Sequence, residues 1–214
     1  MSIKRYVADK DNVITNAFQS NLTTRGTGSN MGLADSLETF SIYAQANSSS
    51  NEQARTLVQF PISSISTDRA SGKLPASGNV NFVLRMFNVK HTDTVPRDFT
   101  LTISPVSQSW EEGYGLDMDN YTDLTYNGTG SNWINAGAGT AWTTPGGDYL
   151  TTPSLIYTAS FDTGIEDLEV DITNLVEQWI TGTAGGGIEN YGVGIQLTSS
   201  QASGSRSYYT KKFS

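Results

Sequence analysis

The sequence predicts an all-β fold, an antiparallel β-sandwich of the jelly-roll type with one decorating α-helix near residues 171–181. Three observations lead to this prediction. Short apolar segments recur with the two-residue period of strands, and segments rich in Gly, Asn, Ser and Thr separate them. Only one segment has the period of a helix. The length of 214 residues suits one large β domain, so we expect residues 1–214 to form a single domain.

The first half of the chain holds four expected strands. They cover residues 39–46, 56–62, 79–89 and 99–106. The strongest is 79–89 (NVNFVLRMFNV), where apolar residues of both parities indicate a strand covered on both faces. In 99–106 (FTLTISPV) apolar residues alternate with Thr and Ser, which is typical of a half-buried strand. The rest of residues 13–50 is polar and turn-rich, and we expect loops there.

The second half combines a long loop excursion, the helix and two more strands. Residues 113–153 are rich in Gly, Asn, Asp and Thr, and an excursion of this length usually carries function or packs on itself. In 171–180 (DITNLVEQWI) the apolar residues share one helical face. Asp171 or Thr173 can cap the start of this helix, and Gly182 follows its end. The final strands are expected at 191–198 and 207–213.

Composition excludes several classes of function. The net charge of −8 and an isoelectric point near 4.5 disfavour nucleic acid and anionic membrane surfaces as partners. We interpret Lys211 and Lys212 as a solvated strand edge. The chain has no cysteine, which excludes disulfides, thiolate nucleophiles and Cys-ligated zinc. The single histidine, His91, is expected in an exposed loop. The sequence displays neither a signal peptide nor a membrane-spanning segment.

A cluster of carboxylates at the start of the excursion has two candidate uses. Its members are Glu111, Glu112, Asp117, Asp119 and Asp123. Two carboxylates across a cleft can cleave glycosidic bonds, so a polysaccharide-degrading enzyme is one hypothesis. Structural calcium is the better use, because Asp117, Asp119 and Asp123 offer hard oxygen ligands on a loop. Asp9 and Asp11 are a weaker calcium candidate, and no other cofactor is expected.

Aromatic residues gather in the same excursion and are candidates for stacking on sugar rings. The candidate glycan-binding residues are Tyr114, Tyr121, Trp133, Trp142 and Tyr149. The alternative is that these rings form a satellite core beneath the excursion. Trp110 and Trp179, which lie elsewhere, are expected in the core.

Three stretches resemble a known domain family. They are residues 55–60 (RTLVQF) with Leu74 and Pro75, residues 109–113 (SWEEG), and residues 170–173 (VDIT) followed by Val176, Trp179 and 190–193 (NYGV). On these residues the chain resembles the DNRLRE domain, which is related to carbohydrate-binding modules of the disaggregatase type. The resemblance runs from about Asp11 to the C-terminus and implies a jelly-roll module with a link to carbohydrate.

A narrower likeness is to virion structural proteins of tailed bacteriophages. It is carried by the words SWEEGYGLDMDNYTDL, TPGGDY, LEVDITNLVEQWITG and SYYTKKFS. It implies a module on the head, collar or tail of a phage particle, made in the host cytoplasm and located on the virion. The DNRLRE pattern usually continues into one more strand, so the last strand here is expected to leave an open edge for assembly. The candidate assembly residues are Tyr208, Tyr209, Lys211 and Phe213.

These observations support three hypotheses of function. The first is a non-enzymatic structural component of a tailed-phage virion that assembles with itself or with another virion protein. The second is a polysaccharide-binding module that adheres to cell-surface glycans, which is compatible with the first. The third is a polysaccharide-degrading enzyme in which Glu111 or Asp119 is essential.

Overall fold

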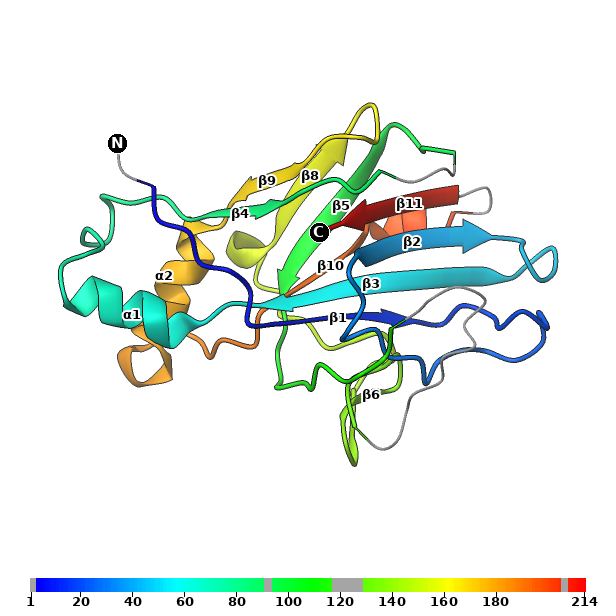
Figure 1. Ribbon diagram of the computed structural model, residues 1–214, viewed down its shortest axis with the longest axis horizontal. Coiled ribbons are helices and arrows are strands. Elements are labelled where there is room, and N and C mark those ends of the chain that lie inside the picture. The colour runs from blue at the N-terminus through cyan, green and yellow to red at the C-terminus, as the bar shows by residue number, and fades with distance from the viewer. Residues whose placement is uncertain (1–2, 91–93, 117–128, 205–207) are drawn as a thin grey trace.

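The computed structural model describes residues 3–90, 94–116, 129–204 and 208–214. Over these residues the chain is an all-β, antiparallel, sandwich-like structure, which confirms the predicted fold class (Figure 1). The strands are β1 (Lys10–Thr15), β2 (Leu37–Tyr43), β3 (Asn51–Gln59), β4 (Val83–Met86), β5 (Phe99–Pro105), β6 (Asn135–Gly137), β7 (Thr140–Ala141), β8 (Tyr157–Phe161), β9 (Leu168–Asp171), β10 (Val193–Leu197) and β11 (Tyr208–Phe213). The helices are α1 (Ile62–Ala70), α2 (Thr173–Thr181) and the single-turn α3 (Ser199–Ala202), with 3₁₀ turns at Pro153–Leu155 and Thr183–Gly185.

Strand β3 organises the main sheet, because three strands pair with it. β1 runs antiparallel along one edge, from Lys10 opposite Gln59 to Thr15 opposite Ala54. Two strands share the other edge: β2 pairs with the first half of β3, and β10 pairs with the second half. The sheet therefore forks beyond β3 into a β2–β11 branch and a β10–β5–β8 branch.

Aromatic rings join the two branches face to face across the main core. Phe99 of β5 stacks on Phe161 of β8 with ring centroids 5.1 Å apart, and it lies 5.8 Å from Tyr209 of β11. Phe213 of β11 lies 6.3 Å from Phe161. The three phenylalanines are almost completely buried, and burying one such ring stabilises a fold by about 1.5–3 kcal/mol. These contacts hold the forked sheet as a sandwich.

Helices α1 and α2 pack together at one end of the sandwich (Figure 1). Helix α2 confirms the predicted helix, and its buried face includes the expected core residue Trp179. Helix α1 (ISSISTDRA) is a second helix that the sequence does not predict, because its few apolar residues do not form a continuous face. The guanidinium of Arg69 on α1 makes paired hydrogen bonds of 2.7 and 3.1 Å to the carboxylate of Glu177 on α2.

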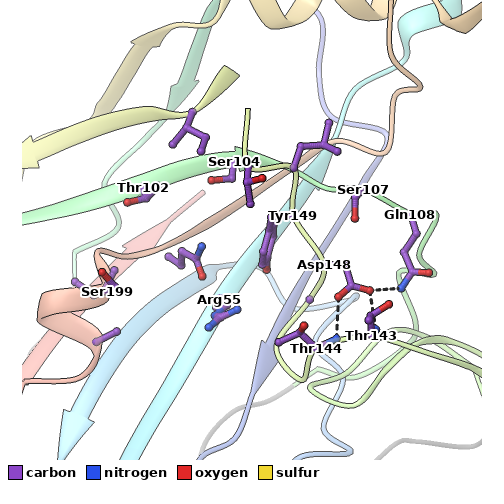
Figure 2. Close-up of a pocket in the computed structure, with 17 residues that line it drawn as sticks. Arg55, Thr102, Ser104, Ser107, Gln108, Thr143, Thr144, Asp148, Tyr149 and Ser199 are labelled. Atoms are coloured by element: carbon purple, nitrogen blue, oxygen red, sulfur yellow. Dashed lines mark hydrogen bonds between the residues drawn. The ribbon is translucent and has the colours of Figure 1, made fainter. Parts of the chain in front are cut away.

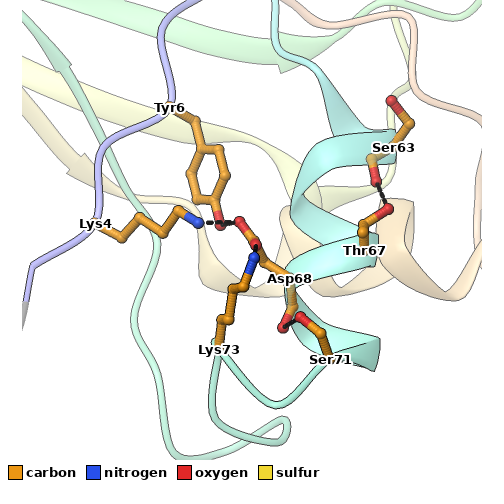
Figure 3. Close-up of polar contacts among 7 residues, drawn as sticks. All are labelled: Lys4, Tyr6, Ser63, Thr67, Asp68, Ser71 and Lys73. Atoms are coloured by element: carbon orange, nitrogen blue, oxygen red, sulfur yellow. Dashed lines mark hydrogen bonds and ion pairs between the residues drawn. The ribbon is translucent and has the colours of Figure 1, made fainter.

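The N-terminal segment is tied to α1 by a polar cluster around Asp68 (Figure 3). The hydroxyl of Tyr6 donates a 2.7 Å hydrogen bond to the Asp68 carboxylate, and Lys4 forms an ion pair with the same oxygen. Hydrogen bonds from Lys4 and Tyr6 hold the pKa of Asp68 below its usual value, while burial raises the pKa of Tyr6 to about 12. These contacts fasten the N-terminal segment to α1.

Several predicted strands need corrected boundaries. The strongest candidate, residues 79–89, forms only the four-residue β4, because Phe82 exchanges hydrogen bonds with Thr173 Oγ1 and the Ile172 N–H at the start of α2. β3 ends at Gln59, since Pro61 precedes the first turn of α1. The segment 13–50, expected as loops apart from residues 39–46, also contains the second half of β1. Strands β8 and β9 are not predicted from the sequence.

The described part of the excursion packs back onto the outer face of β3 and β1. It forms a second hydrophobic cluster with residues of these strands: Ile14, Leu57, Val106, Trp110, Trp133, Ala136 and Trp142. Two indole N–H groups in this cluster have backbone partners, since Trp110 donates to the Tyr191 carbonyl and Trp142 to the Asn132 carbonyl, each at 2.8 Å. The excursion therefore carries its own core, and that core covers part of the outer face of the sheet at β1 and β3.

The outer edge of β11 is paired within the chain at its C-terminal end. The N–H groups of Phe87 and Val89 donate to the carbonyls of Ser214 and Lys212, and the Ser214 N–H donates back to Phe87, all at 3.0 Å. The prediction of an open final edge is therefore wrong for residues 212–214. The segment that follows β4 takes the place of an additional strand.

Candidate functional site

An open groove of about 1020 Å³ lies on the outer face of the sheet, next to the second hydrophobic cluster (Figure 2). Residues of β3, β5 and β10 form its floor, and residues 143–151 and α3 form its walls. Hydroxyl, amide and guanidinium groups make up a large part of the lining. They include Arg55, Thr102, Ser104, Gln108, Tyr149 and Gln196.

Strand alternation places these polar side chains in the groove. In β5 the buried residues Leu101 and Ile103 face the main core, so Thr102 and Ser104 point to the opposite side. In β10 the buried Ile195 is followed by Gln196, which lies directly opposite Thr102 in the strand register. The floor therefore contains a short row of polar side chains, Thr102, Ser104 and Gln196, on the face of the sheet opposite the main core. We call this row the polar ladder.

Arg55 lies where the groove meets the second cluster. Its Nη1 donates a 2.7 Å hydrogen bond to the carbonyl of Gly146, and its guanidinium carbon lies 4.9 Å from the ring centroid of Trp133 and 5.8 Å from that of Tyr149. Cation–π contacts of this kind fix the orientation of a guanidinium. Among the described residues no carboxylate forms an ion pair with Arg55. The groove thus contains a fixed positive charge.

Tyr149 stands beside Arg55 and depends on a glycine in the floor. Its hydroxyl donates a 2.9 Å hydrogen bond to the Gly146 carbonyl, and a Cβ atom at Gly194 would overlap its ring. Burial raises the pKa of Tyr149 although Arg55 opposes the shift, so its hydroxyl stays protonated at neutral pH. Gly194 therefore leaves the space in which this ring forms part of the groove.

Asp148 is the one carboxylate among the described residues that line the groove. Its Oδ2 accepts hydrogen bonds from the Thr143 N–H at 2.7 Å and from Gln108 Nε2 at 2.9 Å, and its Oδ1 accepts one from the Thr144 N–H at 2.8 Å (Figure 2). Because both oxygens already have donors, the carboxylate fixes the wall of the groove.

The predicted glycan-binding residues do not form one surface. Tyr149 lines the groove, whereas Trp133 and Trp142 are buried in the second cluster with exposed fractions of 7% and 5%. For these two tryptophans the satellite-core alternative is correct, since a buried ring cannot stack on a sugar. Tyr114 is exposed but does not line the groove, and Tyr121 lies outside the described residues.

The predicted calcium ligands Asp117, Asp119 and Asp123 lie outside the residues that the structure describes, as does His91. Of the weaker pair, Asp11 is half-buried, and its N–H donates to a carboxylate oxygen of Glu112 at 3.0 Å. Burial and the neighbouring Glu112 raise the pKa of Asp11. Across residues 3–90, 94–116, 129–204 and 208–214, no three acidic, histidine or cysteine side chains converge as a metal site would need.

Glu111, a candidate catalytic carboxylate, supports the excursion instead. Its Oε2 accepts hydrogen bonds from the N–H groups of Gly130 and Ala138, each at 3.0 Å. It does not line the groove.

The predicted assembly residues differ in accessibility. Lys211 and Phe213 are buried, with exposed fractions of 1% and 0%, and Tyr209 packs on Phe99 in the main core. Only Tyr208, which is 45% exposed, presents a large part of its side chain at the surface. The interpretation of Lys211 as part of a solvated edge is therefore wrong, because β11 points this side chain into the core.

No protein-family model matches the chain, and searches of curated proteins and of solved structures return no match. The likeness to DNRLRE domains and to phage proteins therefore stays a prediction. In the described part of the chain, no helix is both long and apolar enough to cross a membrane.

Sequence reasoning missed most of the groove. In the sequence, Arg55 stands out only as part of the stretch that resembles the DNRLRE family. Thr102, Ser104 and Gln196 are polar positions in predicted strands. The alternation of 99–106 did contain the signal, because it assigns Thr102 and Ser104 to one face. The alternation does not show which other segments border that face and form the walls of the groove.

Proposed function

We propose that this protein is a non-enzymatic module that binds a polysaccharide in the groove over β3, β5 and β10. The observation that carries the proposal is the polar ladder of Thr102, Ser104 and Gln196 beside the ring of Tyr149. Sugar hydroxyls pair with amide and hydroxyl groups, and the apolar faces of sugars pack on aromatic rings. An open groove suits a long polymer that enters and leaves at both ends.

Binding is favoured over hydrolysis by the charges in the groove. Hydrolysis of a glycosidic bond ordinarily requires two carboxylates on either side of the bond. Of the described lining residues only Asp148 has a carboxylate, and three donors already occupy it. The polar groups that remain are suited to holding a sugar chain.

The test is affinity electrophoresis through gels that contain one soluble polysaccharide each, with a neutral set (dextran, galactomannan, hydroxyethylcellulose) and an acidic set (alginate, polygalacturonate). The double variant Thr102→Ala/Gln196→Ala removes a cross-strand pair from the floor. Since one hydrogen bond contributes about 0.5–1.5 kcal/mol, we expect about a tenfold loss of affinity.

The matched control is Thr100→Ala/Ser160→Ala. These two residues also form a polar cross-strand pair on the outer face of the sheet, with hydroxyls 3.1 Å apart, but they do not line the groove. The control variant should bind as the parent does. Retention of the parent on none of the gels, or equal losses in the two double variants, would rule out the groove as a glycan site.

We also propose, from the resemblance in sequence alone, that the module is part of a tailed-phage particle. The buried state of Lys211 and Phe213 removes these two residues from the surface available for assembly and leaves Tyr208. Mass spectrometry of purified particles should find this chain in a fixed ratio to the major head or tail proteins. Its absence from particles would refute this placement and leave the glycan proposal untouched.

A further inference from the structure

Lys211 is a fully buried lysine in the last strand of the sandwich, and it reaches a side chain from a distant segment. Its Nζ lies 2.6 Å from Oδ1 of Asn88, 2.7 Å from the Glu166 carbonyl and 3.0 Å from the Gly164 carbonyl. The rings of Phe161 and Phe213 flank the amine, with centroids 4.9 and 5.4 Å from Nζ. The buried amine and the half-buried carboxamide of Asn88 therefore meet between two aromatic rings and two backbone carbonyls.

The surroundings favour the neutral amine more than water does. Burial lowers the pKa of Lys211 to about 8, against the opposing charges of Glu166 and Asp167. At neutral pH the free amine, which is the nucleophilic form, is therefore more populated than for a lysine in water.

The backbone holds Asn88 in place beside this amine. Asn88 lies opposite Phe213 in an antiparallel bridge, and its N–H donates a 2.9 Å hydrogen bond to Oδ1 of Asp167. Two reacting groups held in contact by fixed strands react as if at a very high concentration, because the entropy of bringing them together is already lost on folding.

From this juxtaposition we propose that Lys211 and Asn88 form an intramolecular isopeptide bond. The Nζ lone pair attacks Cγ of Asn88, the new N–C bond forms, and the bond from Cγ to the amide nitrogen breaks. That nitrogen leaves as ammonia after it takes one proton from the attacking amine. No oxidant, reductant or other reactant is needed, and the product is a secondary amide that links the two side chains.

Glu166 is the group that we assign to carry the proton. Its carboxylate oxygen Oε2 is buried and has no hydrogen-bond partner among the described residues, and its charge acts on the Lys211 amine without forming an ion pair with it. The same residue contributes its backbone carbonyl to Lys211. The bond would fasten β11 to the segment after β4 and so lock the edge of the sandwich covalently.

The experiment is intact-mass spectrometry of the denatured full chain, followed by tryptic mapping. We expect the parent to be lighter than its sequence mass by one ammonia, and to yield a branched peptide that contains both Lys211 and Asn88. Lys211→Arg and Asn88→Ala should each have the full sequence mass. Lys212→Arg, at the neighbouring position of β11, should still lose ammonia.

Two alternatives are separated by these variants. Loss of ammonia by ring closure at an Asn-Gly step such as Asn127-Gly128 would persist in Lys211→Arg and would give no branched peptide. A parent with the full sequence mass overturns the proposal and leaves Lys211 as a hydrogen-bonded anchor.

The role of Glu166 is tested separately by a time course. Chains made by cell-free synthesis are denatured at intervals and weighed, and Glu166→Gln should lose ammonia at least tenfold more slowly than the parent. An equal rate would overturn the assignment of Glu166 as proton carrier. Circular dichroism of Glu166→Gln distinguishes a slow reaction from a chain that has not folded.

Discussion

Arg55 and Lys211 occupy similar surroundings on the two sides of the same forked sheet. Each cation lies near two aromatic rings and donates hydrogen bonds to backbone carbonyls. Arg55 is covered on one side only, by the second cluster, and its other side faces the groove. Lys211 is enclosed by both branches of the sheet and is 1% exposed. The comparison teaches that the burial of a cationic side chain decides which groups it can interact with. A half-covered cation can contact a ligand, whereas an enclosed one can contact only groups of its own chain.

The largest expected effect is on the enclosed side. Lys211→Met should lower the free energy of unfolding by about 3 kcal/mol, because one buried and two partly buried oxygen acceptors lose their donor. Lys212→Met is the control, and its partly exposed ion pair with Glu38 should contribute less than about 1 kcal/mol. Urea unfolding followed by tryptophan fluorescence measures both. Similar values for the two variants would contradict the account of Lys211.

The groove can be disrupted by a substitution at Gly194, the glycine in its floor. In Gly194→Val the new side chain overlaps the ring of Tyr149, so we expect about 1–3 kcal/mol of destabilisation together with loss of polysaccharide retention. Ser160→Val, on an exposed position of β8, should change neither property by a comparable amount. Urea unfolding and affinity electrophoresis give the two measurements. Retention of full binding by Gly194→Val would show that Tyr149 is not part of the binding surface.

A subtler change keeps the charge in the groove and alters its shape. Arg55→Lys loses the planar guanidinium that bonds the Gly146 carbonyl between two rings. We expect about a fivefold loss of affinity, equivalent to about 1 kcal/mol, with little change in fold. Arg85→Lys, an exposed arginine on β4, is the control. If both variants bind as the parent does, the guanidinium of Arg55 serves only to hold the wall.

The smallest effect is expected at acid pH near the enclosed cation. Burial alone would raise the pKa of Glu166, but N–H donors of its own turn lower it to about 2 from 4.5. A carboxylate with a depressed pKa contributes stability that is present above pH 4.5 and is lost as the pH falls toward 2. In an Asn88→Ala background, which excludes the covalent bond, Glu166→Gln should therefore lose less stability over that range. Acid titrations of the two proteins with the same slope would contradict this.

The sequence predicts a segment correctly where the pattern of its apolar and polar residues shows which face is buried. Residues 99–104 alternate strictly between apolar and polar, and they lie in β5 with the expected buried face. Helix α2 has an apolar face, and it was predicted within a few residues. Helix α1 has no such face, so nothing in its pattern distinguished it from a loop. Residues 79–89 are apolar on both faces, but the expectation that both faces are covered is wrong: Leu84 and Met86 are buried, whereas Val83 and Phe87 are exposed.

The candidate site was predicted in only one of its parts. Tyr149 lines the groove as its aromatic ring predicts, whereas Trp133 and Trp142, which carry the same signal, are buried. Aromatic residues serve a core and a sugar surface equally well, so composition could not separate the two uses.

By itself the sequence determined that this chain forms a β-sandwich with a helix near its C-terminal third, because period and turn residues are local properties. Tertiary structure alone decided which cation faces a groove and which is enclosed. Arg55 and Lys211 stand in similar strand contexts, RTLVQ and YTKKF, and each is flanked by polar and apolar neighbours. Their surroundings differ because the sheet forks at β3, which places Arg55 on the outer face of the sheet and Lys211 between its two branches. No local sequence pattern specifies such a fork.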